Sequence, residues 1–265
     1  MMRTKRTAIE CLVWMVAMLP LPGLVMAQAP ATADRFPPAG RLVEVGGHRL
    51  HLNCTGHGGP TVVIENGTGD FSFDWSLVQP VLSRQMRVCT YDRAGYAWSE
   101  PGPQPRTFQQ IALELHTGLH KLEIKGPYVL VGQSYGGFPA RAFAKYYPQE
   151  VAGMVLVDAL HEDSRVIIGG QAVRIRELAP GRDIPASQLK PTPKTPPARA
   201  PEAGQPAPAS SKLEPPLDRL PPQIQQTRLW AQSQPDYQAA SSNEREWSAE
   251  ELARMSANRE SLNFP

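Results

Sequence analysis

Hydrophobic and polar positions follow two different periods along the chain, and these periods predict strands and helices in turn. Continuous apolar runs bounded by glycine, proline or asparagine are typical of buried strands. Stretches of helical period separate these runs, so we expect an α/β fold with a mostly parallel, doubly wound sheet covered by helices on both faces. The apolar runs are residues 61–65, 87–91, 128–131 and 151–157.

A different pattern precedes the first apolar run. Residues 41–45 and 48–54 alternate on the two sides of Gly46-Gly47, which predicts a β-hairpin. His48 and His51 fall on opposite faces of the second strand. We therefore expect both to be surface residues and not a metal-binding pair.

Thr107 is placed to cap a helix that leads to the strand at 128–131. His116 and His120 lie four residues apart on this helix, a spacing that can bind zinc. They lack the nearby glutamate of a metalloprotease motif and lie beside the apolar stripe, so we expect no metal site there. The stripe consists of Ile111, Leu115, Leu119 and Leu122.

The segment Gly132-Gln-Ser134-Tyr-Gly136 joins the strand at 128–131 to a predicted helix at 138–146. In this setting a Gly-x-Ser-x-Gly turn is so sharp that the serine is strained and its hydroxyl points out of the carboxyl end of the sheet. Side chains at Gly132 and Gly136 would collide with the turn. We therefore interpret Ser134 as a nucleophile, the alternative being a serine that caps the helix.

The first 27 residues have the order of a signal peptide, with basic residues, an apolar run and cleavage after Ala27. An uncleaved membrane anchor is the alternative, but the run is short for a span. Export to the periplasm or the extracellular medium leaves Cys54 and Cys89 in an oxidising compartment. They can form a disulfide or remain two separate buried thiols.

Composition divides the rest of the chain. Residues 28–40 are rich in alanine and proline and predict a linker before a core at 41–165. Prolines gather between Pro185 and Pro222, so we expect a largely disordered insertion at 166–222. Helical patterns return at 223–265, with a capping box that begins at Ser248. A formal net charge of +2 gives no reason to expect a nucleic-acid partner.

Five segments together resemble the α/β-hydrolase fold superfamily, in particular its exported bacterial esterase-like members. They are the hairpin at 41–54, the loop 66–69, the segment 91–96, the turn 132–136 and the strand 153–158. The resemblance implies strands one to six of that fold, with residues 223–265 as a partial helical cap. It also implies that Cys54 and Cys89 lie close enough to form a disulfide after export.

The resemblance further implies an oxyanion hole made by the backbone N–H groups of Tyr135 and Thr68. Such donors stabilise the anionic oxygen of a tetrahedral intermediate. Trp230 and Trp247 would line a lipophilic pocket or pack onto the core. Family members usually carry an acid and a histidine base after later strands, and neither is found in those places here. We therefore expect a chain truncated at its carboxyl end, without the last strands.

Two residues remain as substitutes for the missing groups. Asp158 follows the strand at 151–157 and is a candidate acid, or a carboxylate that stabilises its own loop. His161 is near the site in sequence but follows the wrong strand, so we do not expect it to act as the base.

These observations predict a serine hydrolase that acts on carboxylic esters or related small acyl substrates through Ser134. The alternative is an inactive fragment, or a binding module with the same fold. Hydrolysis of haloalkanes or epoxides would need a carboxylate nucleophile, which Ser134 argues against. We expect no cofactor, no metal and no stable membrane insertion after signal cleavage.

Overall fold

The structure of the chain, a computed structural model, describes residues 36–161, 163–168, 170–175 and 212–244. The chain divides into two units, Met1–Pro37 and Pro38–Pro265, and every element below belongs to the second. The predicted signal peptide, most of the predicted linker, Trp247 and the helix expected from Ser248 lie outside the described residues.

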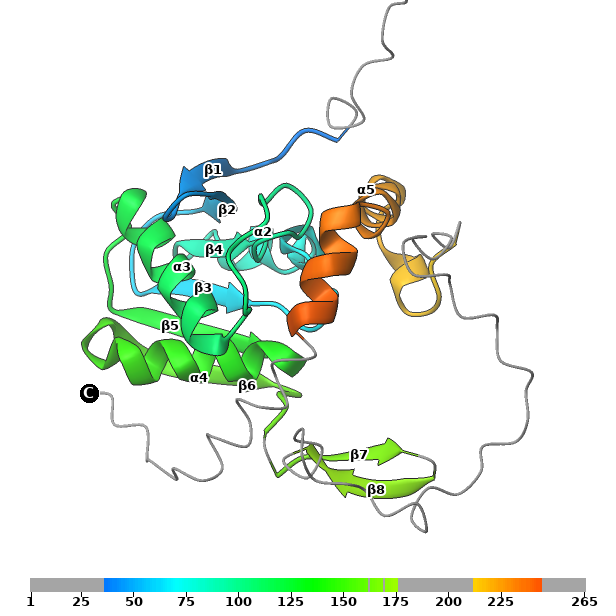
Figure 1. Cartoon of the computed structure of the whole chain (residues 1–265). Coiled ribbons are helices and arrows are strands. Elements are labelled where there is room, and N and C mark those ends of the chain that lie inside the picture. Colours follow the sequence, from blue (N-terminus) through cyan, green and yellow to red (C-terminus); the bar gives the residue numbers. More distant parts are fainter. Residues whose placement is uncertain (1–35, 162, 169, 176–211, 245–265) are drawn as a thin grey trace, which may run out of the picture. The chain divides into compact units, whose positions relative to one another are not determined.

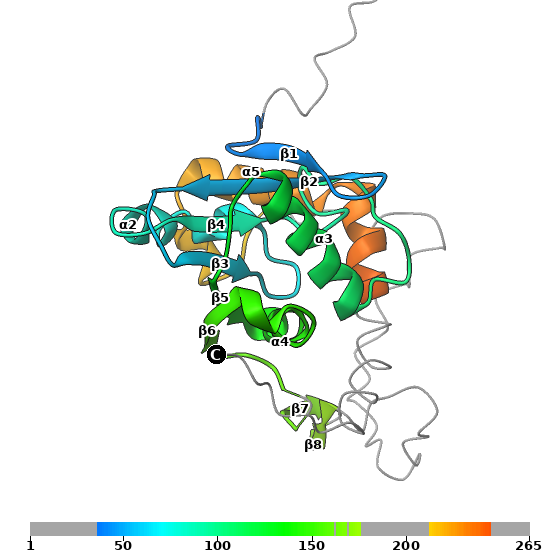
Figure 2. The ribbon, with the colours of Figure 1, turned by 90° about the vertical axis from the view of Figure 1, so that its left-hand side faces the viewer.

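The core of the second unit is a six-stranded sheet with the order β1-β2-β4-β3-β5-β6 (Figures 1 and 2). Strands β3 to β6 run parallel to one another, and the hairpin β1–β2 is antiparallel, as is the pairing of β2 with β4. The predicted mostly parallel α/β sheet is thereby confirmed. The strands are β1 Arg41–Glu44, β2 Arg49–Thr55, β3 Thr61–Glu65, β4 Val88–Tyr91, β5 Tyr128–Gln133 and β6 Val151–Val157.

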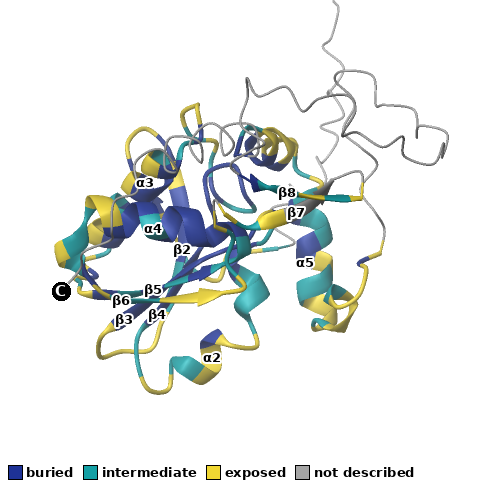
Figure 3. Cartoon of the chain, turned by 90° about the horizontal axis from the view of Figure 1, so that it is seen from below, coloured by how far each residue is buried: buried dark blue, intermediate teal, exposed yellow. Residues whose placement is uncertain are grey.

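Helices cover the two faces of the sheet unequally (Figure 3). Helices α3, Phe108–Lys121, and α4, Gly137–Tyr146, pack side by side on one face over the largest apolar cluster. Thr107 begins α3 as expected, because its side chain accepts a hydrogen bond of 3.1 Å from the Gln110 N–H. The opposite face carries the short helices η1, Ser72–Trp75, and α2, Gln79–Leu82, over β3 and β4.

The prediction that His48 and His51 are surface residues is wrong. Their side chains are buried, with exposed fractions of 5% and 1%. Strand β2 is covered on both faces, so a side chain on either face of it is removed from water. His48 pairs with Glu114 of α3, with 3.2 Å between Nε2 and Oε1.

A second hairpin lies where we expected disorder. Strands β7, Arg165–Ile168, and β8, Gln171–Arg174, pair in antiparallel fashion. Their sequence contains a β-branched run followed by Gly169-Gly170, which is a hairpin pattern. The proline-rich composition that suggested disorder begins only after this hairpin.

The described part of the chain resumes at residues 212–244, which lie at the end of the sheet to which β3, β4 and β5 point (Figure 1). This segment contains η6, Leu217–Arg219, helix α5, Pro222–Gln232, and helical residues 235–244. It buries Tyr237 and Ala240 against Phe71 and Tyr96 of the core. Among the described helices, none combines the length and the apolar character needed to cross a membrane.

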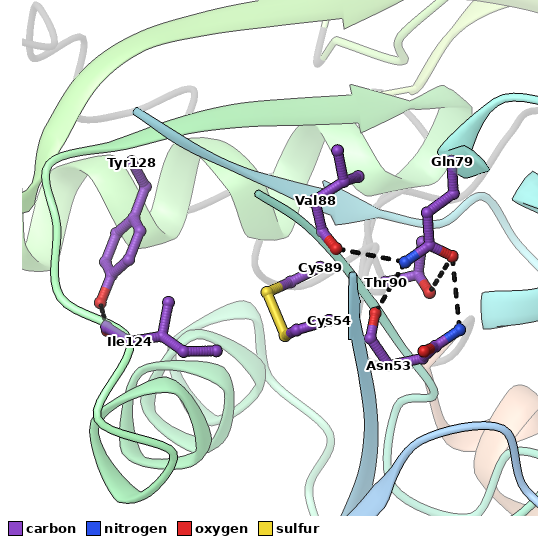
Figure 4. The surroundings of a disulfide bond; sticks show 8 residues. All are labelled: Asn53, Cys54, Gln79, Val88, Cys89, Thr90, Ile124 and Tyr128. Atoms are coloured by element: carbon purple, nitrogen blue, oxygen red, sulfur yellow. Dashed lines mark hydrogen bonds between the residues drawn. A yellow bond between two sulfur atoms is a disulfide. The ribbon is translucent and has the colours of Figure 1, made fainter. Parts of the chain in front are cut away.

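A disulfide joins Cys54 at the end of β2 to Cys89 in β4 (Figure 4). The two residues are direct partners in the antiparallel register, and their Cα atoms lie 4.0 Å apart. Beside the disulfide, the Gln79 amide donates to the carbonyl oxygens of Asn53 and Val88 at 2.8 and 3.2 Å. The same pair of strands is therefore joined by a covalent bond and by a side chain from α2.

Candidate active site

Ser134 lies directly after β5, in a tight turn that leads into α4. Its backbone φ is +50°, in the left-handed region that non-glycine residues rarely occupy. A Cβ atom at Gly132 would come within 2.8 Å of the Gly137 Cα, and one at Gly136 within 2.2 Å of the Glu65 carbonyl oxygen. Only glycine fits at these two positions, and the turn holds Ser134 in a strained conformation at the carboxyl edge of the sheet.

The loop after β3, residues 66–69, lies against this turn, and we call it the oxyanion loop after the role expected of Thr68. A Cβ atom at Gly67 would meet the Gln133 side chain at 2.4 Å, so the loop backbone passes directly beside the last residue of β5. Thr68 is exposed, whereas Tyr135 is 4% exposed and packs against Phe108 at the start of α3. The loop and the turn that carry the two expected oxyanion donors are thus adjacent.

Arg93, in the loop after β4, holds the oxyanion loop in place. Its guanidinium group donates to the carbonyl oxygens of Asn66 and Gly67 at 2.8 and 2.9 Å. Its Nε donates to Glu244 at 2.9 Å, and its Cζ lies 5.1 Å from the centroid of the Tyr135 ring. Arg93 and Glu244 are both 1% exposed, so this pair is fully buried. No local pattern indicates this pairing, because 151 residues separate the two partners.

Glu65, the last residue of β3, lies behind the turn and is completely buried. Its carbonyl oxygen faces Gly136, and its carboxyl group accepts a hydrogen bond of 2.7 Å from the Tyr91 hydroxyl. Burial raises the pKa of Glu65 to about 7, although the Tyr91 hydrogen bond and the Arg93 charge lower it. The backbone of Glu65 therefore borders the turn at Ser134, and its buried carboxyl group is bound by Tyr91.

His51 and Asp92 form a second buried contact of the loop after β4. His51 Nδ1 lies 2.7 Å from Asp92 Oδ2, and His51 Nε2 accepts a hydrogen bond of 3.1 Å from the Gly40 N–H. The Nδ1 proton is therefore the one that reaches Asp92. Asp92 Oδ1 also accepts from the Ser72 N–H at 2.7 Å. Both ring nitrogens of His51 are occupied, so this histidine holds the loop and is not available as a base.

Arg228 connects α5 to the segment that follows the oxyanion loop. It donates to the Gly69 carbonyl oxygen at 3.2 Å and to Asp70 at 2.9 Å, and it also pairs with Asp74. Burial raises the pKa of Asp74 to about 6, despite the opposing charge of Arg228. Trp230 of the same helix packs against Trp98, with ring centroids 5.6 Å apart. This supports the interpretation of Trp230 as a packing residue.

Asp158 and His161 follow β6 on the other side of the turn. The loop they share touches the turn, because the Leu160 N–H donates to the Ser134 carbonyl oxygen at 2.8 Å. Asp158 itself is exposed and has a φ of +44°. His161 Nδ1 accepts from the Asp163 N–H at 3.1 Å, and its side chain is 49% exposed. The structure brings the backbone of this loop to Ser134. It shows no hydrogen bond between the side chains of Asp158 and His161.

The chain has six histidines, and all lie within the described residues. In the described part of the chain, no hydrogen bond joins the Ser134 hydroxyl to any of them. Among the described residues, a group of His116, His120 and Glu150 has the spacing of metal ligands. It lies at the opposite edge of the sheet and takes no part in this site.

Residues 57–176 match the family model described as alpha/beta hydrolase fold. This match covers the parallel strands, the turn at Ser134 and the loop after β6. The fold is that of the α/β hydrolases. This fold supports a hydrolase, and the parts of it that the described residues contain are the central strands, the turn with Ser134 and the helices α3 and α4.

Several known proteins are similar to this chain over less than half of their own length. It is 35% identical over 129 residues to a probable transporter, efuK, of Hormonema carpetanum, covering 46% of this chain and 18% of that protein. It is 33% identical over 114 residues to a 2-hydroxy-6-oxononadienedioate/2-hydroxy-6-oxononatrienedioate hydrolase of Cupriavidus pinatubonensis, covering 41% and 39%. A thermophilic esterase from Thermogutta terrifontis superposes with a TM-score of 0.42 at 30% identity, covering 46% of each chain.

Proposed function

We propose that Ser134 is the nucleophile of a hydrolase site for carboxylic esters or related acyl compounds. The observation that carries this proposal is the strained backbone of Ser134, with φ +50° between two glycines that admit no side chain. Strain of this kind persists only where the surroundings enforce it, and it is concentrated at functional sites. The hydrolase named among the similar proteins supports the same class of reaction.

The proposed oxyanion hole uses the N–H groups of Tyr135 and Thr68. Arg93 supports this assignment, since it fixes two carbonyl oxygens of the oxyanion loop and lies over the Tyr135 ring. Arg93 is here a positioning residue, because it acts on the donors and not on the substrate. Each donor is worth about 3 kcal/mol of transition-state stabilisation in enzymes where this has been measured.

A serine hydroxyl is a weak nucleophile until a base takes its proton. We therefore propose that this chain binds acyl groups but turns them over slowly. His161 and Asp158 are the nearest substitutes along the chain, and His161 is already occupied by the Asp163 backbone. A binding module with the same fold is the second candidate, favoured by the absence of a histidine at Ser134 among the described residues.

Export is also a proposal. Residues 1–27 have the pattern of a signal peptide, and the Cys54–Cys89 disulfide supports an oxidising compartment.

Added imidazole separates the two candidates. It can act as a diffusing base for a serine that has its oxyanion donors but no histidine. We expect imidazole to accelerate p-nitrophenyl butyrate hydrolysis by the parent chain more than by Ser134→Ala, which serves to subtract the direct reaction of imidazole with the ester. Equal acceleration in both proteins would contradict a nucleophilic Ser134.

A boronic acid provides the matching binding experiment, because its boron atom forms a tetrahedral adduct with a serine oxygen. We expect butylboronic acid to bind the parent chain and not the Ser134→Ala variant. A binding module would instead bind a non-hydrolysable butyrate amide equally well with and without the Ser134 hydroxyl, and would show no gain with imidazole.

A further inference from the structure

Two histidines and a glutamate meet at the amino ends of β5 and β6. His116 and His120 lie one turn apart on α3, and Glu150 ends η3, Pro148–Glu150, just before β6. The Nε2 atoms of His116 and His120 each lie 2.9 Å from a different carboxylate oxygen of Glu150. The three candidate ligand atoms are all within 4.8 Å of one another. We propose that these three residues form a zinc-binding site.

The choice of metal follows from the donor atoms. Two imidazole nitrogens and a carboxylate oxygen are a common set for zinc, which binds such atoms at about 2.0–2.2 Å. Ligand atoms around a tetrahedral zinc at that range lie roughly 3.3 Å apart. The two 2.9 Å contacts would have to open by a few tenths of an ångström to admit the ion, and the widest separation of ligand atoms, up to 4.8 Å, would have to close toward this value. Three protein ligands leave a fourth position for water.

The orientation and exposure of the three side chains are compatible with binding an ion from solvent. The His116 ring stacks on Tyr147 with a centroid distance of 3.8 Å and an interplanar angle of 4°, so its plane is fixed. The side chains of His116, His120 and Glu150 are 20%, 50% and 29% exposed, so an ion can enter from solvent.

The site lies far from Ser134. Glu150 immediately precedes the start of β6, and Ser134 follows the end of the neighbouring strand β5. Six residues of β5 separate the two edges of the sheet, which amounts to roughly 20 Å at about 3.3 Å per residue. An ion at this position would cross-link the second half of α3 to the start of β6. Its role is therefore to stabilise the fold and not to activate the substrate.

The sequence alone argued against this site, because the histidine pair has no glutamate on its own helix. The fold supplies the third ligand from 30 and 34 residues further along the chain. The same trio could also exist as two imidazole N–H groups that donate to one carboxylate, without any ion. The experiment has to distinguish a metal site from this hydrogen-bonded group.

Zinc binding is best measured on the full chain, produced without a histidine tag and stripped with EDTA. ZnCl₂ is titrated in competition with a chromophoric zinc chelator. We expect one zinc per chain, and at least tenfold weaker binding in His120→Gln and Glu150→Gln, since even residues that only orient a ligand contribute tenfold or more. His57→Gln, which removes an exposed histidine outside the group, should bind like the parent.

A second measurement guards against misfolded variants. His120 is half exposed, so His120→Gln should keep the parent circular dichroism spectrum. Zinc should raise the thermal midpoint of the parent and of His57→Gln, but not of Glu150→Gln. Absence of saturable binding to the parent would overturn the proposal. Parent-like binding in both His120→Gln and Glu150→Gln would overturn it as well, since the metal would then lie elsewhere.

Discussion

Two loops flank Ser134, and each begins with an aspartate directly after a parallel strand. Asp92 follows β4, is completely buried, and accepts hydrogen bonds from His51 and Ser72. Asp158 follows β6, is exposed, and has a left-handed backbone. We call residues 65–99, which include the loops after β3 and β4, the closed flank. We call residues 158–164, which follow β6, the open flank. The difference shows that the packing around a carboxylate, and not its place in the strand order, decides what it holds in position.

The closed flank is also tied to a distant part of the chain. Arg93 pairs with Glu244, and Arg228 of α5 pairs with Asp70 and Asp74. In the open flank the Leu160 side chain packs against the main apolar core, and His161 lies 3.9 Å from Asp163, but no described buried ion pair ties this flank to the segment 212–244. Among the described residues, one side of Ser134 is therefore fixed by buried charges, and the other by a backbone hydrogen bond and the apolar side chain of Leu160.

The largest effect should follow from Arg93→Met. The substitution removes the guanidinium group that pairs with Glu244 and frees two carbonyl oxygens of the oxyanion loop. Breaking a buried pair in this way costs about 3–5 kcal/mol of unfolding free energy. Urea unfolding followed by circular dichroism measures it. Arg49→Met is the matched control, because the pair of Arg49 with Glu100 is exposed and should contribute little; equal losses would erase the contrast between buried and exposed pairs.

The disulfide should give the next largest effect. Cys54 and Cys89 close a loop of 35 residues that contains β3 and the oxyanion loop. Replacing both cysteines by serine should lower the unfolding free energy by about 3–4 kcal/mol, because the unfolded chain gains conformational freedom. Thiol titration of the unreduced, denatured protein provides the first check. Finding both Cys54 and Cys89 free to react would refute the bond.

Glu65→Gln should raise the unfolding free energy, in contrast to the two changes above, and only at higher pH. Burial raises the pKa of Glu65 to about 7 in the folded chain, from 4.5 when solvated. Its contribution to stability is therefore complete below pH 4.5 and is lost as pH rises through 7. The amide removes this loss, so the variant should gain up to about 3 kcal/mol over the parent at pH 8 and nothing at pH 4.5. Parallel urea midpoints across this range would contradict the buried carboxyl group.

The two aspartates give the smallest difference and the most direct comparison. Asp158→Asn should change the unfolding free energy by less than about 0.5 kcal/mol, since the residue is exposed and asparagine also tolerates a positive φ. Asp92→Asn should cost about 2 kcal/mol, because a buried charged acceptor is lost. Both values come from the same urea experiment. A cost at Asp158 as large as that at Asp92 would mean that the open flank is fixed after all.

The sequence predicted those parts of the fold that depend on neighbouring residues. Strands β3 and β6 occupy the predicted residues 61–65 and 151–157, because each is an apolar run between strong turn signals. The turn at Ser134 was visible because its glycines are a local steric requirement. The hairpin β7–β8 was missed for a local reason too, since composition was averaged over a window dominated by later prolines.

The contacts that position the site could not be predicted in this way. The role of His51 depends on Asp92, and that of Arg93 depends on Glu244, so neither role can be predicted from a short segment of sequence. Strand period placed His48 and His51 on opposite faces but could not show that both faces are covered. Burial and pairing at long range arise only once the sheet and the segment 212–244 are assembled.

Strand β6 has a consequence for the protein in solution. It pairs with β5 on one side and is the last strand of the six-stranded sheet. The side chains of Val155, Leu156 and Val157 are 49%, 53% and 41% exposed, so the free edge is also apolar. Edges of this kind add strands from neighbouring molecules, and a formal net charge of +2 provides little repulsion against such contact. We therefore expect the edge of β6 that the described residues leave unpaired to favour association between copies of the chain as its concentration rises.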